Sequence, residues 1–161
     1  MRALNSRFFT WGSIGFMLCV FSNVFAAGAH LVTYTSKNDC ATVKAAITDA
    51  IGGAGLVINT TSHIGEMLER TGKDMGGAKA IFLHAESFEF CSATVSRKTM
   101  EADPHNIVFC PYIISVYVLP KTPKITYVSF RKPTPVGSAA SKASLKEVEK
   151  LMRSIIDEAL N

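Results

Sequence analysis

The sequence YIISVYVLPKTPKITYVSFR, residues 112–131, contains two strong strand signals. Its two ends, 112–119 and 124–131, are rich in the β-branched and aromatic residues that favour strands. The segment PKTP that joins them is short. Because parallel strands need a much longer crossover, the sequence predicts an antiparallel pair here. The two prolines leave the type of the turn open.

Upstream of this pair, strand-like and helix-like segments alternate. The first helix has Asn38 or Asp39 as its candidate cap and the pair Gly52-Gly53 as its stop signal. The predicted elements are strands at 30–36, 55–63 and 78–86 and helices within 38–55 and at 64–75. This mixture predicts an α+β fold: a single two-layer domain, with a mixed or antiparallel sheet and helices on one face.

Downstream of the pair, residues 134–143 have the composition of a linker, and 144–161 predict a C-terminal amphipathic helix. Ser144-x-x-Glu147 fits a capping box at its start. The apolar stripe of this helix comprises Leu145, Val148, Met152, Ile155 and Ala159. We expect the stripe to pack on its own domain, with a homodimer seam as the alternative.

The N-terminal residues 1–26 resemble a secretory signal peptide. Arg2 and Arg7 precede a nearly uncharged apolar run, and small residues allow cleavage after Ala26 or Ala29. An uncleaved membrane anchor is the alternative, because the run approaches the length of a bilayer span. We expect a secreted, periplasmic protein that makes no membrane contact after cleavage.

The charge of the chain is small. The formal charge is +4, and removal of Arg2 and Arg7 leaves 15 basic and 13 acidic residues, a charge of +2. A charge this low argues against nucleic acid as a partner.

Three cysteines remain after the signal, namely Cys40, Cys91 and Cys110. In an oxidising compartment, an odd number suggests one disulfide and one remaining thiol. We predict the bridge Cys91–Cys110, which would stabilise the fold by about 3 kcal/mol. Cys40 could replace either partner. Redox use of the pair is the alternative, although the Cys-x-x-Cys spacing typical of redox motifs is absent.

His63 ends a predicted strand directly before a helix, and His84 lies in an apolar strand. Imidazole and thiolate groups bind zinc, copper or haem iron when two or more converge. No close histidine pair and no Cys-x-x-Cys-His motif is present, so covalent haem attachment is not supported. Non-covalent haem or an apolar ligand stays open, and the identity of any metal is unknown.

The sequence contains little evidence of catalysis. There is no nucleophile elbow, and the glycine pairs at 52 and 76 lack the lysine of a phosphate-binding loop. Whether the protein is an enzyme stays uncertain, and we lean towards a protein that is not.

Three segments carry a resemblance to a known family. FCSATVSRKTMEADPHNIVFCPYIISVYVLP (90–120), ITYVSFRKP (125–133) and TVKAAITDAIGGAGLVINTTSHIGEML (42–68) resemble the domain of unknown function 302 (DUF 302) family, in its cysteine-containing branch. The resemblance covers roughly 32–133 and leaves the C-terminal helix outside. It implies a DUF 302-like α+β domain over 30–133, often exported and without an agreed activity.

The resemblance also places the recurrent histidine of the family on His63, and haem binding has been associated with some relatives. We therefore expect a non-enzymatic binding module for an apolar or haem-like ligand. The candidate ligand-binding residues are His63, Met67 and His84. The alternatives are a thiol-redox protein that uses Cys91 and Cys110, and a structural protein that binds a partner or dimerises through its last helix.

Overall fold

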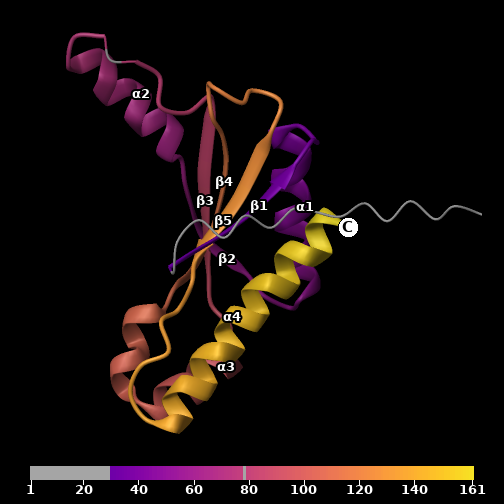
Figure 1. Cartoon of the computed structure of the whole chain (residues 1–161), viewed down its shortest axis with the longest axis vertical. Helices are drawn as coiled ribbons and strands as arrows, with labels where there is room; N and C mark the ends of the chain where they lie inside the picture. The colour runs from indigo at the N-terminus through magenta and orange to yellow at the C-terminus, as the bar shows by residue number, and fades with distance from the viewer. Residues whose placement is uncertain (1–29, 78) are drawn as a thin grey trace, which may run out of the picture.

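The computed structural model describes residues 30–77 and 79–161. Within them, a five-stranded sheet runs in the order β1-β5-β4-β3-β2, and each neighbouring pair is antiparallel (Figure 1). The elements are β1 (Leu31–Ser36), α1 (Cys40–Gly53), β2 (Ile58–Ser62), α2 (Ile64–Asp74), β3 (His84–Phe90), α3 (Ala93–Ala102), the 3-10 helix η1 (Pro104–Phe109), β4 (Tyr112–Val118), β5 (Thr126–Arg131) and α4 (Ala139–Leu160). The predicted α+β fold is confirmed.

The predicted antiparallel pair forms as β4 and β5. Their ladder runs from Ser115 opposite Ser129 to Val118 opposite Thr126. Alternate side chains of the strands point towards the helices and form the core, since successive residues of a strand face opposite sides of the sheet. The members of this set that belong to the core cluster are Val32, Tyr34, Phe88, Phe90, Tyr112, Ile114, Val116, Val128 and Phe130.

Helices α1 and α4 cover this inner face of the sheet and pack on each other. Asp39, one of the two candidate caps, caps α1 by accepting a hydrogen bond of 3.0 Å from the backbone N–H of Thr42. The apolar stripe of α4 is buried at Leu145, Val148, Met152, Ile155 and Ile156. The stripe therefore packs on its own domain, and a dimer through it would require α4 to leave the sheet.

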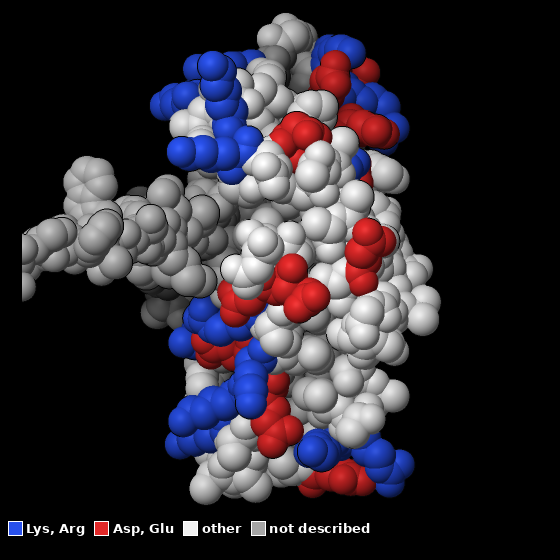
Figure 2. Space-filling view, turned by 90° about the vertical axis from the view of Figure 1, so that its right-hand side faces the viewer, with Lys and Arg blue, Asp and Glu red and all other residues white. Residues whose placement is uncertain are grey.

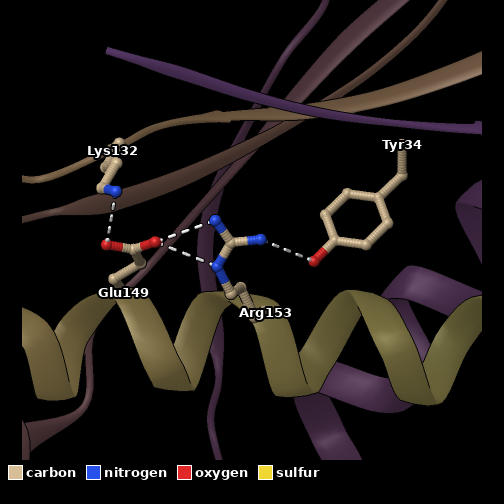
Figure 3. Close-up of polar contacts among 4 residues, drawn as sticks. All are labelled: Tyr34, Lys132, Glu149 and Arg153. Carbon is tan, nitrogen blue, oxygen red and sulfur yellow. Dashed lines mark hydrogen bonds and ion pairs between the residues drawn. The ribbon is translucent and has the colours of Figure 1, made fainter. Parts of the chain in front are cut away.

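Arg153 ties α4 to the sheet (Figure 3). Its guanidinium donates two hydrogen bonds to Glu149 Oε1, at 2.8 and 3.0 Å, and a longer one of 3.4 Å to the hydroxyl of Tyr34. Glu149 also pairs with Lys132 at 3.3 Å, and the guanidinium lies 5.9 Å from the centre of the Phe130 ring. Burial raises the pKa of Tyr34, so its hydroxyl stays protonated at neutral pH. Glu149 is thus shared by two cations, Arg153 of α4 and Lys132 directly after the end of β5.

The middle of the chain differs from the prediction. The third strand covers His84–Phe90 rather than 78–86, because the apolar run before it lies in an exposed loop, with Ile81 57% exposed and Leu83 46% exposed. Helix α3 was not predicted. Ser92 caps it by accepting a hydrogen bond from the N–H of Val95 at 3.4 Å.

The last helix also begins earlier than predicted. It starts at Ala139, inside the predicted linker 134–143, and Ser138 caps it. The predicted cap, Ser144, lies within the helix and donates a hydrogen bond to the carbonyl of Ser141. Ser141 is fully buried and accepts a hydrogen bond of 2.9 Å from the side chain of Asn106. The contact between Ser141 and Asn106 joins distant segments and stabilises helix in residues whose composition is typical of a linker.

Among the described helices, none has both the length and the hydropathy that a membrane span needs. The predicted signal peptide at 1–26 lies outside the described residues.

On the side of the molecule drawn in Figure 2, basic and acidic side chains are interspersed, and the described residues there form no continuous basic stripe.

Candidate functional site

Two of the three residues predicted to bind a ligand are neighbours, because the N–H of Met67 donates a hydrogen bond of 3.1 Å to the carbonyl of His63. The side chain of His63, directly before α2, is 54% exposed, and Met67 on α2 is 42% exposed. His84 lines a cavity of about 560 Å³ between the start of α1 and the β4–β5 turn. Neither His63 nor Met67 lines this cavity or the cavities of about 320, 640 and 410 Å³ elsewhere in the described residues. His63 and Met67 therefore lie together at the start of α2, whereas His84 lines a cavity to which neither of them contributes.

Glu86 connects His63 to α1. Its carboxylate accepts a hydrogen bond from Lys44 Nζ, and its Oε1 lies 3.8 Å from Nδ1 of His63. Cys40 lies one helical turn before Lys44, and burial raises the pKa of its thiol despite the nearby ammonium group. The arrangement is an ion pair beside a protonated thiol. No group of three or more His, Cys, Asp and Glu in the described part of the chain converges as a metal site.

Cys91 and Cys110 lie in contact, with 2.8 Å between their Sγ atoms. The sheet brings them together, because Cys91 follows Phe90, which pairs with Tyr112 at the start of β4. Both are free thiols in the structure, so the bridge stays a prediction. Burial, and then the neighbouring thiol, raise the pKa of Cys91 to about 11. Its thiol is protonated at neutral pH and is therefore a poor nucleophile.

A row of hydroxyl groups crosses the outer face, which is the side of the sheet turned away from α1 and α4. In register, Ser62 stands opposite Ser87, Ser87 opposite Ser115, Ser115 opposite Ser129, and Ser129 opposite Thr33. Each strand thus supplies one hydroxyl to the row. The side-chain oxygens of Ser87 and Ser115 lie 2.8 Å apart, and those of Thr33 and Ser129 lie 3.0 Å apart. These cross-strand hydrogen bonds fix the orientation of the row.

Aromatic side chains stand beside the hydroxyl row. The rings of Tyr117 and Tyr127 stack with 5.3 Å between their centres. The rings of Phe82 and Tyr117 pack edge to face, with 5.6 Å between their centres. The hydroxyl of Tyr117 lies 3.1 Å from Oγ of Ser129. The outer face therefore presents apolar rings next to fixed hydroxyl groups.

A cavity of about 410 Å³ lies over this part of the outer face. The lining combines Ile64, Phe82, Ala85, Tyr117 and Leu119 with hydroxyls of the row and with Leu31 and Glu86. Helix α2 projects away from the sheet in Figure 1, so only its start contributes to this cavity. That start lies so close to β3 that a Cβ on Gly65 would be 2.9 Å from the backbone nitrogen of Ala85.

Sequence reasoning missed the outer face as a site. The signal was present in the alternation of β4 and β5, where Ser115 and Tyr117, and then Tyr127 and Ser129, occupy the positions between residues buried on the inner face. Such alternation predicts a half-buried strand and is silent about its function. Alignment of the hydroxyls on five strands depends on register, which the sequence alone did not supply.

The fold and the cavity together define a two-layer α+β domain with a concave site on one face of its sheet. The family model for Domain of unknown function DUF302 matches residues 32–161, and the chain belongs to this family. The matched range extends beyond 133 and includes α4.

The fold is similar to a crystal structure of an uncharacterized conserved protein DUF302 from Bacillus stearothermophilus. The TM-score is 0.67 and the sequence identity 16%, with 82% of this chain and 99% of that chain covered. At this identity, the similarity concerns the fold alone. No curated protein matches the chain.

Proposed function

We propose that this protein is a binding module for a small, largely apolar ligand on the outer face of the sheet. The cavity of about 410 Å³ carries this proposal. Its walls include Ile64, Phe82 and Leu119, and its floor carries Ser87 and Ser115. Ligand sites in proteins are mostly apolar and contain a few polar groups that fix the orientation of the ligand.

The hydrogen bonds of the row support binding rather than reaction. Ser87 bonds with Ser115, and Ser129 bonds with Thr33 and Tyr117. A nucleophilic serine needs a neighbouring base, commonly a histidine. Among the hydrogen bonds of the described residues, none joins a serine of this row to a histidine. The hydroxyls are therefore suited to orienting a ligand.

Haem is a narrower version of this proposal. The lining of the cavity contains neither of the predicted ligands His63 and His84. Tyr117 is the lining residue whose side chain can ligate haem iron. We therefore propose an apolar organic ligand, rather than haem, as the ligand of this cavity.

Export is part of the proposal and rests on the sequence of residues 1–26. Sequencing the N-terminus of the protein from its native compartment tests it. We expect the mature chain to begin at Ala27 or at His30.

A reversible disulfide is the second candidate function, favoured by the 2.8 Å contact of Cys91 and Cys110. With glutathione disulfide as oxidant, the two thiols would yield one bridge and two molecules of glutathione. The high pKa of Cys91 makes a slow, structural bridge a better fit than fast catalysis. Mass spectrometry after thiol alkylation measures the bridge, and two free thiols after equilibration with the oxidant would exclude it.

Fluorescence of N-phenyl-1-naphthylamine tests the binding module, because this uncharged probe emits strongly in apolar surroundings. We expect saturable binding by the native chain. Ser115→Leu fills the floor of the cavity and should weaken binding about tenfold or more, equivalent to about 1.4 kcal/mol. Ser154→Leu, at an exposed position of α4, is the matched control and should bind normally. Normal binding by a folded Ser115→Leu protein would exclude this site.

A further inference from the structure

The two central strands separate at one end of the sheet. Their ladder ends at Ser115 opposite Ser129, although β4 begins at Tyr112 and β5 continues to Arg131. In the same register, Pro111 would stand opposite Pro133. Neither proline has an N–H to donate, so pairing of the strands cannot continue to that point.

This separation opens the β4–β5 cleft, a cavity of about 320 Å³. Ile113 and Arg131, from the outer face, contribute to its lining. Phe130 from the inner face, and Val148 and Met152 from α4, also line it. The cleft therefore reaches both faces of the sheet and has an apolar interior.

The β4–β5 cleft adjoins the cavity of the proposed binding site. Leu31, Ser115 and Ser129 line both of them. A ligand that lies along the hydroxyl row can therefore extend one end into the cleft.

Arg131, the last residue of β5, is an exposed cation in the lining of the β4–β5 cleft. The neighbouring cations Lys132 and Arg153 are both paired with Glu149, as Figure 3 shows. Arg131 has no carboxylate within ion-pair distance among the described residues. A guanidinium group suits a carboxylate or sulfonate, to which it can donate two parallel hydrogen bonds.

We propose that the ligand of the outer face is an amphipathic organic acid. Its apolar body lies on the aromatic and aliphatic walls beside Tyr117, and its anionic group lies at Arg131 in the mouth of the β4–β5 cleft. This inference rests on the proposed function, because it names the chemical class of the ligand for the same site.

A pair of fluorescent probes tests the inference in the full chain. 1-Anilinonaphthalene-8-sulfonate carries a sulfonate on the ring system of N-phenyl-1-naphthylamine, which is uncharged. We expect Arg131→Gln to weaken binding of the sulfonate about tenfold, as expected for loss of a hydrogen-bonded charge. The same variant should leave the affinity for the uncharged probe unchanged. Lys121→Gln removes an exposed charge in the β4–β5 turn and should alter neither affinity.

Unchanged affinity of Arg131→Gln for the sulfonate would overturn the inference and leave the binding module intact, provided that the uncharged probe binds and Ser115→Leu weakens it. Equal weakening of both probes by Arg131→Gln would also overturn it, since the residue would then act on the shape of the site. Failure of both probes to bind the native chain would overturn the proposed function and, with it, this inference.

Discussion

Ser115 and Ser129 form the last residue pair that joins β4 to β5, and both belong to the hydroxyl row of the outer face. On one side of this pair, Tyr117 stacks on Tyr127 beside the proposed binding cavity. On the other side, the strands separate into the β4–β5 cleft. The pair therefore stands where the apolar site and its candidate anion site meet.

The two faces of β4 should respond differently to truncation. Ile114 is fully buried on the inner face, whereas Ile113 is 36% exposed on the outer face. Ile114→Ala should lower the free energy of unfolding by about 2–5 kcal/mol, because it leaves a cavity in the core. Ile113→Ala should cost about 1 kcal/mol. Urea unfolding measures both, and equal losses would contradict the assignment of the faces.

Gly65 should be needed for the close approach of α2 to β3. In Gly65→Ala, the new Cβ meets the backbone of Ala85, so the start of α2 must shift. We expect a loss of about 1–3 kcal/mol in unfolding free energy, together with weaker binding of N-phenyl-1-naphthylamine through the displacement of Ile64.

Gly53→Ala is the matched control. Gly53 ends α1 with open space around the position of a Cβ, and its backbone is not left-handed. This change should stabilise the protein by up to about 1 kcal/mol. A neutral effect at Gly65 would show that α2 has room to move away from β3.

The sequence predicted those parts of the fold that local signals determine. Alternation in 112–119 and 124–131 predicted β4 and β5, and Asp39 was correctly among the candidate caps of α1. The start of α4 was predicted wrongly, because the burial of Ser141 against Asn106 is a contact between distant segments. The composition of a segment does not predict its contacts with distant residues.

The candidate site could be predicted less well from the sequence than the fold. Attention to chemically versatile residues selected His63, Met67 and His84, none of which lines the outer-face cavity. The outer-face cavity is built from serines, tyrosines and aliphatic residues that are individually ordinary. Their convergence follows from the order and register of the strands, which are long-range properties of the sheet.

Stability of the reduced protein should fall as the pH rises from about 9 to about 11. Burial raises the pKa of Cys91 from 9.0 to about 11, so the folded state holds its proton more tightly than the unfolded state does. This contribution is fully present below pH 9 and is lost as the pH rises through the folded pKa. Urea midpoints of the native chain and of Cys91→Ser measure it. A loss of stability of the same size in Cys91→Ser would assign the pH dependence to other groups.

Alkylation provides a second measure of the same pKa. Because iodoacetamide reacts with the thiolate, the rate at Cys91 should reach half of its maximum near pH 11, as the pKa of the thiol indicates. Peptide mass spectrometry follows the rate at this residue. Rapid alkylation of Cys91 at pH 7 would instead indicate a thiolate and favour the redox function.

Haem addition distinguishes the narrower ligand proposal. If iron binds through the outer-face cavity, Tyr117→Phe should remove the Soret shift, while His63→Ala and His84→Ala should leave it unchanged. Loss of the shift in either histidine variant would place haem at the residues that the sequence suggested. Absence of any Soret shift in the native chain would exclude haem as a ligand.

The most direct test of the binding site is a map of amide chemical shifts in the isotope-labelled protein during titration with N-phenyl-1-naphthylamine. If the ligand binds on the outer face, saturable changes should centre on Ser87, Ser115 and Tyr117, which line the outer-face cavity. Changes confined to Met67 and the later turns of α2, or to the cavity that His84 lines, would contradict binding at this site.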